Sequence, residues 1–362
     1  MAFDLQPGDE QRALKETLHD FAESVLRPAA RDCESAGRVS PEIARGIHEI
    51  GVTAPVAEEF GGGGELDPIT YCIAAEELAW GDPGIAFWAL GSGLAAIAIA
   101  EAAAPEVKER LLPRFAAEEP VPSFVAVGEK LAAGDLEFLD TTVDGDKVSG
   151  EKYGVLNAGD AAVGVVFGTS SDGIGAVIVE TDDGYEIVKS EDKLGLEAAP
   201  TSVVRFDVAG DQTDPRGTLR AALWSKLLTG ALAVGTARAS LEYATQYATE
   251  REAFGKPIGA FQGISFKIAD MAIEVDAARM AVWKAAWKLA RDEASPADLA
   301  EAVGQALVTA VRCGDDGVQI LGGHGYIRDH PVEKWFRDAV TLSVFDAPDV
   351  LGDSIVARGV TA

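Results

Sequence analysis

The sequence predicts an α+β protein with an N-terminal all-α domain, a middle β-barrel domain and a C-terminal four-helix bundle. Two observations lead to this prediction. Near both ends of the chain, apolar residues recur at three- and four-residue spacing, which is typical of amphipathic helices. Between residues 121 and 214 the period changes, and short valine- and isoleucine-rich runs alternate with turn clusters. We expect domains at 1–118, 119–215 and 216–362.

The first domain is expected to be helical from about residue 9. Its first apolar stripe consists of Leu14, Leu18, Phe21 and Val25. Ser40 followed by Pro41 predicts the start of a further helix, because serine is a preferred N-cap and proline is favoured in the first turn. The glycine run at 61–64 follows no strand pattern and precedes no helix start. We therefore expect a loop there and no phosphate cradle.

Three β-branched runs predict strands in the second domain. They lie at residues 163–167, 176–179 and 202–208. Clusters of aspartate and glycine at 144–146 and 182–184 mark turns between strands. Short strands separated by such turns predict a small β domain.

The third domain is predicted from a helical hairpin. Apolar residues repeat in three-four steps over 223–248 and again over 261–282, so each helix carries one apolar seam, as in an antiparallel bundle. Pro257 and the glycines around it cannot continue the first helix and must form a corner. Arg251 ends the first helix and Gln262 opens the second, so both polar groups can reach this corner.

The composition excludes several functions. With 59 acidic and 31 basic residues the net charge is −28, which argues against a nucleic-acid partner. The three cysteines are far apart, which predicts a reduced, cytoplasmic protein, and the four histidines show no metal-ligand spacing. We expect no signal peptide. The most apolar window, residues 91–104, is too short to span a bilayer, so we expect no membrane span.

Two blocks of the sequence resemble signatures of the acyl-CoA dehydrogenase family. Residues 251–262 read Arg-x-x-Phe-Gly-x-Pro-Ile-x-x-Phe-Gln, and residues 319–326 read Gln-Ile-Leu-Gly-Gly-His-Gly-Tyr. Pro-Val-Glu-Lys and Arg-Asp-Ala follow within 331–339. The resemblance covers nearly the whole chain. It implies the family's fold, FAD as cofactor, an acyl-CoA substrate, and an electron-transfer flavoprotein as acceptor.

In that family both blocks contact FAD across a dimer interface. An arginine offers a fixed fork for the pyrophosphate, and glycines allow the backbone to come close to it. The resemblance therefore implies cofactor-binding roles for Arg251, Phe254, Gln262, Gln319, Gly322 and Gly323. We expect the guanidinium of Arg251 to face across a subunit interface and not into its own β domain.

The family removes a proton from the acyl α carbon with a carboxylate while a hydride passes from the β carbon to the flavin. Most relatives have a glutamate in a Tyr-Glu-Gly-Thr segment, and the resemblance places Asp346 at that position, within Phe-Asp-Ala-Pro. Aspartate is one methylene shorter, and a displacement of about 1 Å can cost roughly 10²-fold in rate. Aspartate bases occur in relatives such as the nitroalkane oxidases, so Asp346 is either the base or a turn residue before Pro348. The second position used by some relatives, near Ser225, has no carboxylate.

Residues that would hold the flavin within the same subunit depart from the family pattern. The family's Thr-Glu-Pro-x-x-Gly-Ser-Asp is replaced at 128–135 by a segment with glycine at both hydroxyl positions. Its Trp-Ile-Thr-Asn reads Gly-Val-Leu-Asn at 154–157, and the Asp-x-x-Arg pair near the thioester is Leu223 and Lys226. Pro348, after the base position, has no N–H to donate.

The intact residues are thus those that would reach a neighbour's FAD. The chain therefore resembles the catalytically degenerate subunit of the heterotetrameric acyl-CoA dehydrogenases of actinobacterial steroid degradation. The first hypothesis is a subunit that completes the FAD site of a catalytic paralogue in lipid or steroid catabolism. The second is a self-sufficient dehydrogenase or oxidase that uses Asp346, as a homo-oligomer. The third is a flavin-free scaffold.

Overall fold

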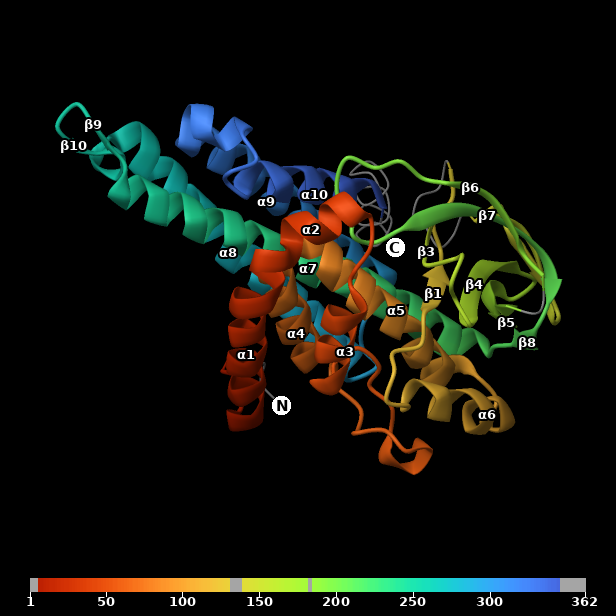
Figure 1. The fold of residues 1–362 in the computed structure, drawn as a ribbon. Helices are drawn as coiled ribbons and strands as arrows, with labels where there is room; N and C mark the ends of the chain where they lie inside the picture. Colours follow the sequence, from red (N-terminus) through yellow and green to blue (C-terminus); the bar gives the residue numbers. More distant parts are fainter. Residues whose placement is uncertain (1–5, 131–138, 182–183, 346–362) are drawn as a thin grey trace.

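The computed structural model describes residues 6–130, 139–181 and 184–345 of the 362-residue chain. The chain folds into a helical domain, a sheet domain and a second helical domain, with the sheet at one end of an elongated molecule (Figure 1). The first domain consists of α1 (Asp9–Phe21), α2 (Arg27–Ala36), α3 (Pro41–Glu49), α4 (Pro68–Gly81), α5 (Pro83–Ala102) and α6 (Pro105–Phe115). A π-helical turn at Ala22–Leu26 joins α1 to α2.

The capping residues explain where several of these helices begin. The hydroxyl of Ser40 accepts a hydrogen bond from the Ile43 N–H at 3.3 Å, which confirms the helix start predicted at Ser40 and Pro41. Asp67 and Asp82 cap α4 and α5 in the same way.

The prediction about the most apolar segment was wrong in length. α5 begins at Pro83 and has 20 residues. An 18-residue window within it has a mean hydropathy of 1.7, so the helix is long and apolar enough to cross a membrane by length and composition. In the folded chain, however, 78% of this window is buried, and α5 packs against α4 and α7. A helix that is apolar on all sides and covered by its neighbours is typical of a protein core.

The sheet domain is mainly antiparallel. Its strands follow the order β6-β7-β3-β2-β4-β5-β8, and β1 pairs with β4 in parallel. The strands are β1 (Ser123–Ala126), β2 (Thr142–Asp144), β3 (Lys147–Leu156), β4 (Val163–Ser170), β5 (Gly173–Glu180), β6 (Glu186–Ser190), β7 (Thr201–Ala209) and β8 (Asp211–Gln212). The three strands predicted from β-branched runs lie within β4, β5 and β7.

The second helical domain is built on α7 (Pro215–Glu250) and α8 (Gln262–Leu289), followed by α9 (Pro296–Leu321) and α10 (Val332–Phe345). Most of the predicted seam is buried, with Leu227, Val234, Met271, Val275 and Val282 all inaccessible. Its first residues on α8, Phe261, Ile264 and Ile268, are half-buried. Between α7 and α8 the chain forms a small hairpin of β9 (Glu252–Ala253) and β10 (Lys256–Pro257). Figure 1 shows this hairpin at the end of the molecule opposite the sheet.

A buried cluster of charges holds the domains together. Lys334 Nζ of α10 lies 2.5 Å from Asp82 Oδ2 and 2.8 Å from Asp338 Oδ2. Asp338 also accepts a hydrogen bond from the Leu196 N–H of the sheet domain at 2.7 Å. Burial alone would lower the pKa of Lys334, but the two carboxylates outweigh it and raise that pKa. The lysine therefore stays charged in the folded protein.

We expect Lys334→Met to be strongly destabilising, because it leaves two buried carboxylates without a counter-charge. The loss should be about 3–5 kcal/mol, measured as a shift in the urea unfolding midpoint. The matched control is Lys147→Met, which breaks an exposed pair with Asp207 and should hardly move the midpoint. Equal shifts for the two variants would contradict the role given to Lys334.

Candidate functional site

The α7–α8 corner, defined here as residues 251–262, projects its side chains into solvent. Arg251 caps α7 through a backbone hydrogen bond to the Tyr247 carbonyl, and its side chain is exposed. Phe254 is 96% exposed and has a positive φ of 52°. Gly255 follows with φ 80°, so the two-residue loop of the hairpin is left-handed throughout. An aromatic residue held in this conformation in open solvent is unusual for a surface loop.

The corner is held in shape by contacts among its own residues. The ammonium of Lys256 lies 4.2 Å from the centre of the Phe261 ring, and Phe254 meets the same ring edge to face. The Ile258 N–H donates to the Arg251 carbonyl at 2.8 Å. Gln262, the first residue of α8, is exposed beside them. The corner therefore presents a cation, an aromatic ring and an amide on one preformed surface.

The second block forms the end of α9 and the 3₁₀ segment Gly322–Tyr326. Gln319 lies exposed in the last turn of α9. Gly322 has φ 58° and ψ −127°, a conformation that side chains rarely adopt, and Gly323 faces open space. Both glycines therefore leave backbone accessible to a ligand.

Two histidines and two tyrosines fix the second block close to the first. The Tyr247 hydroxyl lies 2.8 Å from His324 Nδ1, and the Tyr243 hydroxyl lies 2.8 Å from His330 Nδ1. The two imidazoles stack, with centroids 5.3 Å apart. Because Tyr247 is one helical turn before Arg251, the six residues predicted to bind FAD gather at one end of the helical domain.

Sequence reasoning missed this histidine–tyrosine cluster. One signal was available: Tyr243 and Tyr247 are four residues apart on α7 and so share a helix face. His324 also belongs to the second block. The spacing alone could not show that the two segments meet, because they are 77 residues apart.

The positions that would hold a flavin within the same subunit lack the side chains of the family pattern and have no space for them. Gly154 on β3 has φ 68°, and a Cβ there would lie 2.4 Å from the ring of Phe345. A Cβ on Gly128 would lie 2.9 Å from the Tyr153 carbonyl oxygen. The tryptophan and threonine of the family pattern do not fit at these two places. Asp346, and residues 131–135 of the altered motif, lie outside the described residues.

Glu129, the carboxylate of that motif, has a structural role. It is buried, and its Oε1 lies 2.7 Å from Lys152 Nζ. It also accepts the backbone N–H groups of Asp140 and Thr141. Burial alone would raise the pKa of Glu129, but Lys152 and these hydrogen bonds lower it, while burial lowers the pKa of Lys152 to about 8. A carboxylate with its acceptor sites occupied is not available as a base.

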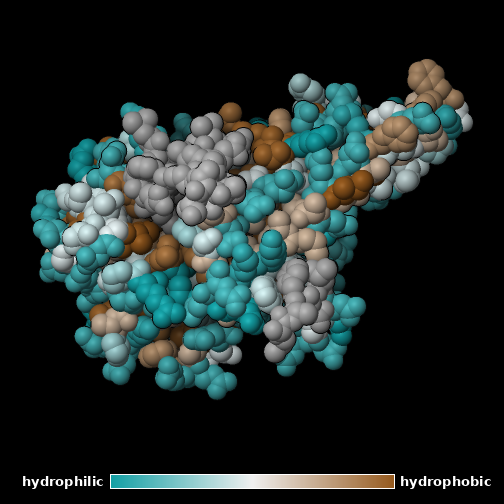
Figure 2. Space-filling view, turned by 180° about the vertical axis from the view of Figure 1, so that it is seen from behind, coloured by the Kyte–Doolittle hydropathy of each residue, from teal (hydrophilic) through white to brown (hydrophobic). Residues whose placement is uncertain are grey.

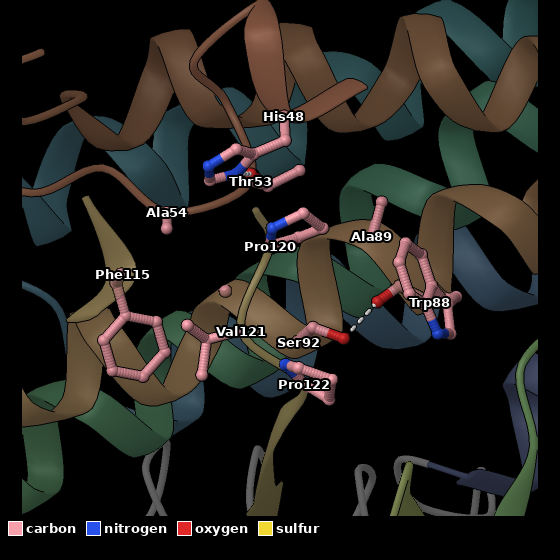
Figure 3. A pocket seen from close by; sticks show the side chains of 11 residues that line it. His48, Thr53, Ala54, Trp88, Ala89, Ser92, Phe115, Pro120, Val121 and Pro122 are labelled. Atoms are coloured by element: carbon pink, nitrogen blue, oxygen red, sulfur yellow. Dashed lines mark hydrogen bonds between the residues drawn. The ribbon is translucent and has the colours of Figure 1, made fainter. Parts of the chain in front are cut away.

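A separate small hollow, partly open to solvent, lies beside α5 (Figure 3). Trp88 and Phe115 contribute aromatic walls, and three residues of the linker before β1 close it. His48 lies on its rim with both ring nitrogens engaged, one by Thr53 and the other by the Ala117 carbonyl. Among the described residues that line it, none is a carboxylate.

Comparison with known proteins identifies the family. Residues 8–119 match the model described as the N-terminal domain of acyl-CoA dehydrogenase, and residues 218–360 match its C-terminal domain. The chain belongs to the acyl-CoA dehydrogenase family. It is therefore a member of a family of oxidoreductases with FAD as cofactor and acyl-CoA as substrate.

Individual relatives agree with this assignment. The chain is 32% identical to a probable acyl-CoA dehydrogenase of Mycobacterium leprae, over 97% of this chain and 95% of the relative. It is 31% identical to the mitochondrial short-chain specific acyl-CoA dehydrogenase of Bos taurus, over 96% of this chain and 89% of the relative. The structure of butyryl-CoA dehydrogenase from Megasphaera elsdenii matches with a TM-score of 0.87 and 28% identity, over 99% of this chain and 100% of that one.

We expect Gly154→Ala to destabilise the protein, because the new methyl group is both strained by the positive φ and pressed into the Phe345 ring. The loss should be about 2–4 kcal/mol by urea unfolding. Combining it with Phe345→Ala should reduce the additional loss to about 1–2 kcal/mol, the cost of the backbone conformation alone.

The matched control for this prediction is Gly145→Ala. Gly145 has nearly the same φ, 61°, but nothing lies within 4 Å of the position of a Cβ. It should therefore show only the backbone cost. If Gly154→Ala behaves like Gly145→Ala, the ring of Phe345 does not pack where the structure places it.

Proposed function

We propose that this chain is an acyl-CoA dehydrogenase family subunit that supplies FAD-binding residues in trans to a catalytic paralogue. The paralogue would carry out the α,β-dehydrogenation of an acyl-CoA thioester. One observation supports this proposal above the others. The residues that match the family's FAD contacts are exposed at the end of the molecule opposite the chain's own sheet, whereas Gly128 and Gly154 have no room for the family's side chains.

The chemistry of the α7–α8 corner suits one half of a dinucleotide. Arg251 can form charge-assisted, bidentate hydrogen bonds to phosphate oxygens. Phe254 offers an exposed ring face for an aromatic base. In a chain with a net charge of −28, Arg251 and Lys256 outnumber Glu252 within residues 251–262, so this corner carries a small net positive charge. These groups could contact the ADP half of an FAD molecule that is bound mainly by a neighbouring subunit.

An apolar stripe along α8 supports subunit association next to this corner. Phe266 is 61% exposed and Ile273 is 68% exposed, and their seven-residue spacing puts them on one helix face with Ala269 and Ala277. Figure 2 shows apolar side chains reaching the surface along the projecting arm. Such a stripe beside a ligand-binding corner is typical of an interface. We propose a paralogous subunit as the partner.

The remaining parts of the proposal follow the family. An electron-transfer flavoprotein is the proposed electron acceptor, the cytoplasm the proposed location, and lipid or steroid catabolism the proposed process. The three cysteines, Cys33, Cys72 and Cys313, are free and buried, which agrees with a reducing compartment.

Two other functions remain as alternatives. A self-sufficient flavoenzyme using Asp346 predicts that the chain purified alone is yellow with bound FAD. A flavin-free scaffold predicts a colourless protein even after co-expression with a paralogue. The proposed trans role predicts protein that is colourless alone and becomes loaded with FAD in the mixed complex.

Replacing Arg251 tests the trans role directly. Arg251→Ala in the co-expressed complex should weaken FAD binding about ten- to hundredfold, because it removes a charge-assisted contact to the pyrophosphate. Arg251→Lys should recover only part of this, since an ammonium lacks the planar fork. Flavin content and affinity are measured after sizing confirms assembly. Wild-type flavin content in an assembled Arg251→Ala complex would reduce this arginine to a helix C-terminal charge.

Asp346→Asn separates the trans role from self-sufficient catalysis. We expect the assembled complex to keep activity within about threefold of wild type, because the base belongs to the paralogue; an essential base in this chain would instead cost about 10²-fold or more. Turnover of an acyl-CoA with a dye acceptor is the measurement. A hundredfold loss would favour the self-sufficient enzyme.

A further inference from the structure

Three elements from different domains meet beside the last turn of α10. The ring of Phe345 lies against Phe87 of α5, with centroids 5.5 Å apart. It also occupies the space that a side chain on Gly154 of β3 would need, 2.4 Å from the position of a Cβ. Two residues further along β3, Leu156 Cδ2 lies 2.8 Å from the position of a Cβ on Gly91 of α5. Side chains of this subunit thus pack directly between the helical domains and the sheet.

These are the positions at which the family pattern has its ring-binding residues. Gly154 stands where that pattern has the tryptophan that stacks on the flavin, and Leu156 stands where it has the threonine that hydrogen-bonds the ring. We call the space bordered by Gly154, Leu156 and Phe345 the ring seat. We propose that Phe345, Phe87 and Leu156 fill the ring seat, so that this chain takes the ADP-like half of a dinucleotide and excludes an isoalloxazine ring.

Two backbone N–H groups at or beside the ring seat are already engaged. The Gly154 N–H donates to Glu191 Oε2 at 3.1 Å. The neighbouring Tyr153 N–H donates to the Gly128 carbonyl at 2.9 Å. A flavin carbonyl needs a donor, whereas a carboxylate such as Glu191 only accepts. A ring forced into this place would therefore displace packed aromatic side chains and leave polar atoms unpaired.

Binding of the ADP-like half and filling of the ring seat rest on different observations. Binding of the ADP-like half rests on the trans role proposed above and on Arg251. The filled ring seat rests on the contacts of Phe345, Phe87 and Leu156 within this chain. An experiment that uses FAD and ADP as separate probes can therefore contradict ADP-like binding without contradicting the filled ring seat, and the reverse.

The test is a calorimetric titration of the purified chain, as the oligomer it forms alone, with FAD and with ADP. Flavin fluorescence and its quenching by iodide report whether the ring is shielded. For the wild type we expect dissociation constants for FAD and ADP within about threefold of each other, since the ring adds little binding free energy, and a ring open to iodide. Phe345→Ala should bind FAD at least about tenfold more tightly with unchanged ADP affinity, because a stacking surface becomes accessible.

Matched controls keep the test selective. Val344→Ala removes an exposed side chain from the same helical turn and should behave as wild type. Arg251→Ala should weaken FAD and ADP equally in both the wild-type and Phe345→Ala backgrounds. Sizing and thermal unfolding check that each variant is folded and assembled.

Four outcomes would decide the matter. A wild-type protein that binds FAD about a hundredfold more tightly than ADP with a shielded ring overturns the filled seat, and so does a Phe345→Ala protein with no gain for FAD. If the wild type binds neither probe but Phe345→Ala gains FAD, the filled seat stands and the claim that this chain takes the ADP-like half by itself fails; the trans role is decided separately by the flavin content of the mixed complex. If neither protein binds either probe, both halves fail, because opening the seat has gained nothing.

Discussion

The buried ammonium of Lys334 is the constraint on which the arrangement of the domains depends. Its two carboxylate partners come from different places: Asp82 caps α5 in the first domain, and Asp338 lies one turn along α10. Asp338 in turn holds the Leu196 N–H of the sheet domain. Removing the lysine leaves two buried carboxylates without a counter-charge, which costs several kcal/mol. The cluster therefore fixes the first domain, the sheet and α10 in one relative position.

That position has consequences for the site. α10 runs from the Lys334 cluster to Phe345, so the charge cluster also determines where the Phe345 ring lies against β3. Gly195 allows the same close approach, because a Cβ there would lie 2.4 Å from the Arg337 carbonyl oxygen. The position of the Phe345 ring thus follows from packing between the domains.

A second buried cluster of ion pairs joins α4 to α7 and α8, the two long helices of the hairpin. Glu76 and Glu77 of α4 are paired with Arg238 of α7 and Arg279 of α8, at distances of 2.5–3.0 Å. α7 has 36 residues, so it is about 54 Å long and carries its end far from the sheet. This length separates the α7–α8 corner from the ring seat. This separation agrees with the proposal that the corner contacts a cofactor bound mainly by a neighbouring subunit.

The sequence by itself determined the helical and strand periods, the cap at Ser40, the corner between α7 and α8, and the two blocks that identify the family. These are local features, because periodicity, caps and turns depend on residues a few positions apart. Sequence matching also identified Gly128 and Gly154 as departures from the family pattern. It could not show what replaces the missing side chains.

Only the tertiary structure decided which distant groups meet. It placed Phe345 on Gly154, His324 on Tyr247 and Lys334 beside Asp82, pairs that are tens to hundreds of residues apart. It also extended the apolar segment at 91–104 to a full buried helix from Pro83. The physical reason is that such contacts arise from close packing of whole elements, whose side chains fit by volume and charge over long sequence separations.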